Sequence, residues 1–496
     1  MKKGLLYTLL GLSLLGASCS DSFLDEDPSN KLGVEGSIKT VIQAQYAIDG
    51  VYDQMSSQEY WGNNYISNFD VMADDMRASE SGRLDDYYRY TFYTESSDAA
   101  MWTRPYRALK NAVSLLDVID DVEAEGDDAI ADKNDIKGQA LALRALIHFD
   151  LVRTFGKPYT HGDAATALGV PIVTTKVNFD EKPARNTVEE VYTQVIKDFE
   201  DAIALLSSDP NTGRINKLAA KALLAKVYLY KGDMTNALAY AEEVLSEPAG
   251  AAIMAREDYV SEWGNPKMSE ALFELVNSSE DNPGLESVGY LSDPDGYGQF
   301  VATDDFIKKL TDAEYDIRGK LLAEDELSTE DKPRMGRVMK YPGNGGPSYT
   351  TNIRIIRTSE VYLIAAEAAL ASDKNKAASY LNAIITRAYP KEDIIIKDED
   401  TEEDIILFDY PSDVPTVTPA SVDLASILYE RSLELVAEGH RFHDLVRNNI
   451  TIQRGDDYWG NSYKDIEMTD HKIIQPIPRI ELDANTNMVQ NPGYES

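Results

Sequence analysis

Aromatic and planar polar side chains gather in two long stretches whose composition suits the binding of a sugar. Tryptophan and tyrosine faces pack on the apolar C–H side of a pyranose, and planar amide, carboxylate or guanidinium groups bond its hydroxyl pairs. Residues 57–97 supply both kinds of group, and residues 255–350 add further aromatic side chains. Packing of each aromatic onto the scaffold is the alternative interpretation. The predicted ligand contacts are Trp61, Asn63, Asp74, Arg77, Tyr87, Tyr88, Trp263, Tyr290 and Tyr297.

The sequence has none of the common motifs of hydrolases or nucleotide-binding proteins. It contains no H-E-x-x-H and no G-x-S-x-G, and the glycine-rich run 343–346 is not followed by the lysine of a phosphate-binding loop. With 85 acidic residues, carboxylate pairs of the kind that hydrolyse glycosides would arise by chance. We therefore predict a binding protein without catalytic residues or a cofactor, and a surface glycosidase is the less favoured alternative.

Two spacings resemble metal sites without completing one. His440 and His443 lie three residues apart in a predicted helix, but no third ligand accompanies them, so helix packing is the favoured interpretation. The stretch from Asp293 to Asp304 partly matches a calcium loop, although Tyr297 occupies a ligand position and Asp304 replaces the bidentate glutamate. We predict no bound metal.

The charge balance limits the partners of this chain of 496 residues. It has 48 Lys and Arg against 85 Asp and Glu, a formal net charge of −37. Binding to nucleic acid or to an anionic lipid surface needs clustered cations, so both are disfavoured. The same charge favours a neutral glycan over a polyanionic one. The 29 tyrosines against 12 phenylalanines suit a wet, polar ligand, because tyrosine has a flat face and a polar rim.

The amino terminus predicts a lipid anchor. Two lysines precede the apolar run 4–17, which has the length of a secretory signal and is too short to span a bilayer. Small residues and Leu15 precede Cys19, the only cysteine, in an arrangement similar to the lipobox of bacterial lipoproteins. We predict a signal peptide over 1–18, lipidation of Cys19 and an acidic tether over 19–38, with no other contact with the membrane. A plain secretory signal is the alternative.

Past residue 38 the hydrophobic periodicity is mainly helical. Strand-like alternation is short, as at 337–340 and 353–356. We therefore predict a mostly α fold. The predicted helices cover residues 39–56, 99–122, 133–155, 188–207, 216–231, 235–247, 357–371, 375–389 and 422–438.

Two of these helix pairs follow the tetratricopeptide pattern of small and aromatic positions. The run 220–248 matches it closely, and the run 364–381 repeats the same spacing 140 residues later. Small residues are needed where the two helices of a hairpin approach closely. We predict a tetratricopeptide-like scaffold over 39–496, interrupted by loop insertions at about 57–97, 255–350 and 391–420. Loops this long are usually functional, so they are expected to form the ligand-binding side.

Several segments, in order, resemble the SusD-like (RagB/SusD) family of outer-membrane lipoproteins. The start of the mature chain, Cys19 with FLDEDP (23–28), and its end, QNPGY (490–494), resemble the two ends of that family. The internal segments that resemble it are ALALRALIHFDLVRTFG (140–156), RNTVEEVYTQVIKDFEDAIALL (185–206), RTSEVYLIAAEA (357–368) and ERSLELVAEGHRFHDLVR (430–447).

The resemblance implies a cell-surface protein of the outer membrane that captures a nutrient, usually a glycan, for polysaccharide utilisation. It further implies a SusC-like TonB-dependent transporter as the partner, to which oligosaccharide is delivered, with the helical repeats on the partner-facing side. Some members of the family take peptide, which is the main alternative ligand. The family's ligand residues vary between members, so the resemblance does not name them here.

Overall fold

The computed structural model describes residues 38–80, 82–95, 99–178, 180–209, 212–397 and 404–494. The predicted signal peptide, Cys19 and nearly all of the tether lie outside these residues. No helix in the described ranges is long and apolar enough to cross a membrane.

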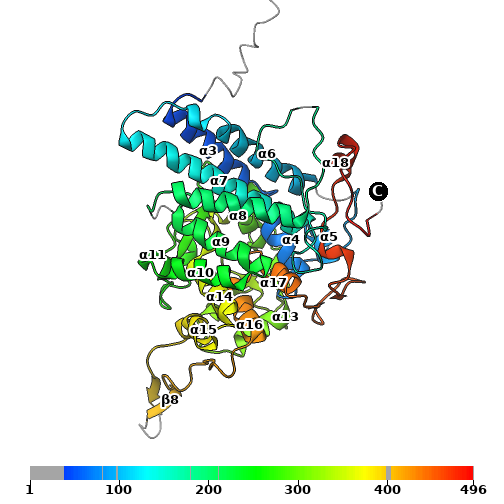
Figure 1. Cartoon of the computed structure of the whole chain (residues 1–496). Helices are drawn as coiled ribbons and strands as arrows, with labels where there is room; N and C mark the ends of the chain where they lie inside the picture. The colour runs from blue at the N-terminus through cyan, green and yellow to red at the C-terminus, as the bar shows by residue number, and fades with distance from the viewer. Residues whose placement is uncertain are drawn as a thin grey trace, which may run out of the picture.

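Four antiparallel helix pairs stack into the scaffold of the described chain, as Figure 1 shows. In each pair the two helices pack together, and successive pairs contact one another through α6 and α7, α8 and α9, and α10 and α14. The pairs are α3 (Val41–Ser56) with α6 (Ala99–Leu116), α7 (Asp127–Phe155) with α8 (Val188–Leu205), α9 (Lys217–Lys231) with α10 (Met234–Leu245), and α14 (Thr358–Ala369) with α15 (Lys374–Ala388). The predicted mostly α, tetratricopeptide-like fold is confirmed.

The pair α9–α10 shows why the repeat pattern folds this way. Ala225, Ala237 and Ala241 are completely buried where the two helices meet, so larger side chains would separate them. Gly232 ends α9 with φ of 80°, a left-handed conformation that glycine adopts without strain. The side chain of Asp233 then accepts from Asn236 N–H and caps α10.

Shorter elements build the insertions and the carboxyl-terminal part. The helices are α4 (Asn64–Met72), α5 (Asp85–Tyr88), α11 (Pro248–Ala251), α12 (Val288–Ser292), α13 (Asp304–Thr311), α16 (Leu424–Leu435), α17 (Arg441–Arg447) and α18 (Arg479–Ala484). The strands form antiparallel pairs, namely β1 (Met76–Ala78) with β3 (Phe300–Ala302), β2 (Ala271–Leu275) with β6 (Ile353–Arg357), β4 (Leu322–Ala323) with β5 (Arg337–Val338), β7 (Ile394–Lys397) with β8 (Asp404–Phe408), and β9 (Ile452–Gln453) with β10 (Asp465–Ile466).

Most predicted helix ends agree with the structure to within three residues, and three differences are larger. Helix α7 begins at Asp127, six residues earlier than predicted, because residues 127–132 are mostly exposed and do not show the apolar periodicity of a buried face. Helix α6 ends at Leu116, and a 3₁₀ turn (Ile119–Asp121) takes the place of its predicted last turn. The stretch 391–420, predicted as a solvated loop, contains the β7–β8 hairpin, which Figure 1 shows projecting from the end of the molecule opposite α3.

Buried ion pairs join the insertions to the scaffold. Arg357, 1% exposed, donates to Glu438 at 2.9 Å, to Glu434 at 2.8 Å and to Glu270. Arg318 from the 255–350 insertion donates to Glu430 at 2.5 Å. Buried charges are tolerated only when they are paired and hydrogen-bonded. These ion pairs therefore fix the positions of β6, the 255–350 insertion and α16 relative to one another.

Candidate functional site

The structure divides the nine predicted ligand contacts into a buried and a surface group. Those that are 8% exposed or less are Trp61, Asn63, Arg77, Tyr88 and Trp263. Those that are partly exposed are Asp74, Tyr87, Tyr290 and Tyr297. Among the second group, Tyr87 packs on Phe92, with ring centroids 5.5 Å apart, and its hydroxyl lies 3.1 Å from the sulfur of Met101.

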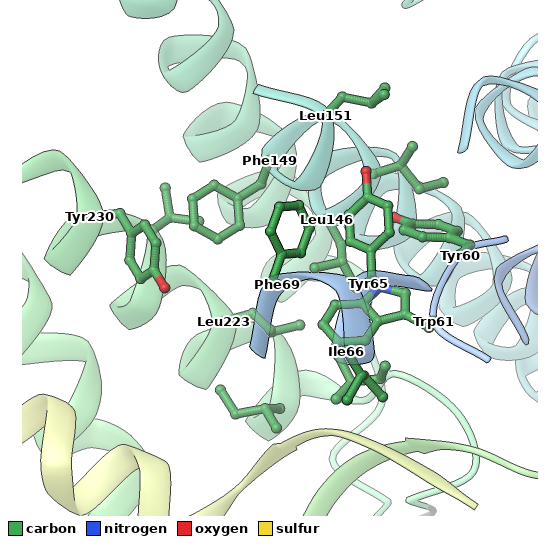
Figure 2. Close-up of a cluster of buried hydrophobic side chains, with 14 of the residues drawn as sticks. Tyr60, Trp61, Tyr65, Ile66, Phe69, Leu146, Phe149, Leu151, Leu223 and Tyr230 are labelled. Carbon is green, nitrogen blue, oxygen red and sulfur yellow. The ribbon is translucent and has the colours of Figure 1, made fainter. Parts of the chain in front are cut away.

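Trp61 joins the first insertion to the scaffold. Its Nε1–H donates to Oδ2 of Asp150 in α7 at 2.9 Å, and the Tyr60 hydroxyl donates to the same oxygen at 2.7 Å. The Tyr60 ring meets the Tyr65 ring edge-on, with centroids 4.6 Å apart. Figure 2 shows these three rings packed against side chains of the α7 segment. With its N–H bonded and its ring 4% exposed, Trp61 presents no face to a ligand here.

Asp74 and Arg77 are both held by charges from the carboxyl-terminal part of the chain. Asp74 accepts two hydrogen bonds from Arg441, at 2.7 and 2.8 Å. Arg77 lies 3.3 Å from Asp457. These pairs fasten strand β1 to residues more than 360 positions later, so their first role is to position the loop.

Asn63 and Trp263 are likewise committed to internal contacts. The Asn63 amide donates to the backbone oxygen of Glu286 at 2.9 Å, which ties the two insertions together. Trp263 is 1% exposed, and the ammonium of Lys340 lies 4.6 Å from its ring centroid. A cation over a buried indole stabilises this part of the core and leaves no room for a sugar ring.

Three tyrosines from the second insertion form a partly exposed aromatic cluster, which we call the tyrosine platform. It consists of Tyr290, Tyr297 and Tyr349. The rings of Tyr290 and Tyr297 stand at 88° with centroids 5.0 Å apart, and Tyr349 lies 6.4 Å from Tyr290. Two faces at an angle make a corner rather than a flat sheet, a shape that fits the C–H face and edge of a ring.

Charged groups border the platform in neutralised pairs. The Arg83 guanidinium lies 3.5 Å from the centroid of the Tyr297 ring and donates to Glu286 at 3.0 Å. Tyr297 donates its hydroxyl to the same carboxylate at 3.2 Å. Desolvation and the Glu286 charge raise the pKa of Tyr297, so its hydroxyl stays protonated at neutral pH. Asp293 pairs with Arg337 at 3.1 Å.

A tight turn sets the platform's geometry. Ser287 caps α12, because its side-chain oxygen accepts a hydrogen bond from Tyr290 N–H at 3.1 Å. This bond fixes the position of Tyr290 in the first turn of the helix. After α12 the chain turns back toward the helix, and Tyr297 N–H donates to the backbone oxygen of Tyr290 at 3.0 Å. A Cβ at Gly296 would lie 2.2 Å from Tyr290 O, so the return is possible only with glycine at this position.

A second aromatic group includes residues that the sequence analysis missed. Trp459 and Tyr458 pack on Tyr88, with centroids 5.2 and 5.1 Å apart, and Trp459 Nε1–H donates to Ala78 O at 2.8 Å. Both are partly exposed. The signal was present, because the run 455–463 mixes tryptophan and tyrosine with glycine, asparagine and aspartate as the predicted insertions do. It lay outside the three insertions and was passed over.

The two aromatic groups meet at one end of the β1–β3 pair. Ala78, whose backbone oxygen accepts from Trp459, lies opposite Phe300 in the β1–β3 pair. The next residue, Ser79, donates its N–H to the backbone oxygen of Gln299 at 3.2 Å. Gln299 follows the turn that carries the platform. Segments distant in sequence are thus brought to a single loop cluster, as expected for a binding side built from insertions on a helical scaffold.

The two metal-like spacings are engaged in other ways. Burial and, for His440, the charge of Lys226 hold the pKa values of His440 and His443 well below the usual range, so both rings are neutral packing elements. Asp304 begins α13 and pairs with Arg334 at 2.8 Å instead of joining Asp293 around an ion. Across the ranges that the structure describes, no group of three or more His, Cys, Asp or Glu side chains is arranged so that it could hold a metal ion.

Comparison with known proteins places these features in a family context. A family model described as "Starch-binding associating with outer membrane" matches residues 22–229, and one described as "SusD family" matches residues 308–494. A crystal structure of a SusD superfamily protein from Bacteroides vulgatus is similar to this chain, with 34% identity and a TM-score of 0.82 over 92% of this chain and 100% of the other.

Two further relatives extend the comparison. SusD-like protein P2 of Formosa agariphila is 24% identical over 98% of this chain and 99% of its own length. The solved structure of a laminarin-binding SusD-like protein is 24% identical, with a TM-score of 0.71 over 92% of this chain and 100% of the other. Both similarities cover nearly the whole chain, so the described body corresponds to the complete folded unit of these proteins.

Proposed function

Because the chain belongs to the SusD family, whose model describes association with the outer membrane, we propose that it is a surface lipoprotein that binds an oligosaccharide. In this proposal the lipidated Cys19 holds the protein at the outer membrane. A SusC-like TonB-dependent transporter receives the bound sugar. A relative with this fold is a laminarin-binding SusD-like protein, which supports a carbohydrate ligand.

The observation behind the proposal is the tyrosine platform with its ring of paired charges. Tyr290 and Tyr297 are partly exposed with their rings at 88°, the Arg83 guanidinium lies over the Tyr297 ring, and Glu286 accepts from both Arg83 and Tyr297. Among the described residues, the two arginines at the platform, Arg83 and Arg337, each face a carboxylate, so neither is free to pair with an anionic sugar. We therefore propose a neutral oligosaccharide as the ligand.

The test measures glycan binding by calorimetry, after a glycan array has selected the ligand. We expect Y290A/Y297A to weaken binding at least about 10-fold. A ring stacked on one aromatic face, as nucleic-acid bases are, contributes on the order of 1–3 kcal/mol. The matched control is Tyr46→Ala, which removes a tyrosine 70% exposed on α3. Unchanged affinity in Y290A/Y297A would remove the platform from the proposal.

The same array separates the alternative ligands. Binding to a pool of peptides with no response to glycans would favour the peptide-binding alternative. A glycosidase would release reducing sugar with sustained turnover. We propose that no turnover occurs, because Glu286 and Asp293, the acidic side chains nearest Tyr290 in sequence, are each engaged by an arginine.

A further inference from the structure

The β7–β8 hairpin exposes apolar side chains at the far end of the molecule. Figure 1 shows it standing away from the helical scaffold, beyond α15. The exposed fractions of its large apolar side chains lie between 39% and 57%, for Ile395, Ile396, Ile405, Ile406 and Leu407. Clusters of exposed apolar side chains on a surface usually mark an interaction site.

Both faces of the hairpin are apolar. Ile395 is paired with Ile406 and Ile396 with Ile405. Neighbouring residues of a strand point to opposite faces, so each face presents one pair of isoleucines. A hairpin that rested on the chain's own body would be polar on its outer side. This one is apolar on both sides, which suits insertion into a cleft that contacts both faces.

The base of the hairpin is anchored to the body, and its apolar part extends away from the body. Phe408, 1% exposed, packs against Tyr315 with ring centroids 5.1 Å apart and stacks on Tyr389. In the described chain neither strand has a second partner, so the outer edges of the pair keep their backbone hydrogen-bonding groups open. A two-stranded hairpin alone is marginally stable in water, and a partner would complete it.

The charge around the hairpin indicates what the partner offers. The described residues between 391 and 413 include five exposed acidic side chains, Glu392, Asp393, Asp404, Asp409 and Asp413, and two lysines, Lys391 and Lys397. One of the two, Lys397, pairs with Asp404 on the neighbouring strand. This surface repels a second copy of a chain whose net charge is −37, and it repels anionic lipid.

We propose that the hairpin is a docking element that inserts into an apolar cleft of another protein, whose rim is lined with lysine and arginine. The isoleucines enter the cleft, and the carboxylates at the base meet the cationic rim. This inference concerns a different end of the molecule from the tyrosine platform and stands independently of what the platform binds.

The test places a photo-crosslinking amino acid at Leu407 of the full chain in the cells that produce it. We expect one predominant partner protein, crosslinked at an apolar segment with lysine or arginine nearby. With that partner purified, we expect I395S/I406S to weaken its binding at least about 10-fold and about 0.5 M salt to weaken it further, because the rim charges are screened. Phe408 is retained, so the melting temperature should stay unchanged.

The matched control is I42S/I130S, which removes two exposed isoleucines, 66% and 44% exposed, from the opposite end of the scaffold. It should leave partner binding intact. The inference is overturned if the crosslink reaches a second copy of this chain, lipid, or many proteins without preference. It is equally overturned if no crosslinked product forms, or if I395S/I406S binds the purified partner as the parent chain does.

Discussion

Gly296 shows how one residue without a side chain sets the geometry of the candidate site. Because a Cβ there would lie 2.2 Å from Tyr290 O, G296A must displace the backbone that orients Tyr297. We expect it to cost about 1–3 kcal/mol in free energy of unfolding and to weaken ligand binding. Urea unfolding and calorimetry check the two effects. Gly50 on α3 has no atom within 4 Å of its Cβ position, so G50A should instead gain up to about 1 kcal/mol.

At the same scale, the aromatic residues show which part of the site could be predicted. The composition of the insertions indicated Tyr290, Tyr297 and Trp61 alike as ligand contacts, and the structure leaves the two tyrosines partly exposed. It could not separate them from Trp61, because the partner that buries Trp61 is Asp150, 89 residues away on α7. Exposure depends on such long-range partners, and a local pattern does not contain them.

Helix α4 illustrates how an insertion element is held against the scaffold. Its Asp70 accepts from the N–H of Gly439 at 2.8 Å, and a Cβ at Gly439 would lie 2.7 Å from Tyr65 O. The carboxyl is 1% exposed. Burial raises the pKa of Asp70 to about 8, with Asp75 and other nearby charges acting in addition. The helix is thus attached through a carboxyl group that is protonated below that pH.

The pKa of Asp70 makes a prediction about pH. An unfolded aspartate ionises near pH 4, so between about pH 4 and pH 8 the folded state holds one more proton than the unfolded state. The free energy of unfolding therefore falls as pH rises through this window. The asparagine side chain of D70N does not titrate, and it keeps an oxygen that can accept from Gly439 N–H. We expect its stability advantage to grow toward pH 8 by up to about 1.4 kcal/mol per pH unit.

Urea unfolding at several pH values measures this difference. Asp128→Asn, at an exposed position in the first turn of α7, is the control, and its difference from the parent chain should stay constant from pH 5 to pH 8. A D70N advantage that is equally constant over that interval would contradict the assignment of the titrating group.

The elements themselves were largely predictable, and the exceptions have a physical cause. Amphipathic helices such as α8 and α10 repeat their apolar positions over three or more turns, so their sequences indicate them. Helix α4 is buried along nearly its whole length and has no polar face to reveal a period. The β7–β8 hairpin was missed because isoleucines occupy both of its faces and give no alternation.

Across the whole molecule, the segments that resemble the family prove to be the parts that join insertions to scaffold. Arg357 begins one such segment, and Glu434 and Glu438 belong to another, and they pair in the core. These paired charges hold the core together, and in our proposal the ligand site lies on the loops instead. A scaffold of this kind can change its ligand by changing loops alone, which explains why the resemblance fixed the fold and not the contacts.

In our proposal, the position of the protein in the cell depends on Cys19, the only cysteine of the chain. Several acyl chains on one sulfur hold a large body at a membrane, since each buried CH₂ contributes about 0.8 kcal/mol. We expect C19A to abolish incorporation of labelled fatty acid and to shift the protein from the membrane fraction to the soluble fraction. Ser22→Ala, three residues on, should change neither. Retention of C19A at the membrane after a high-salt wash would instead indicate that the folded body itself attaches to the membrane. Binding to the transporter would then be the first contact to test.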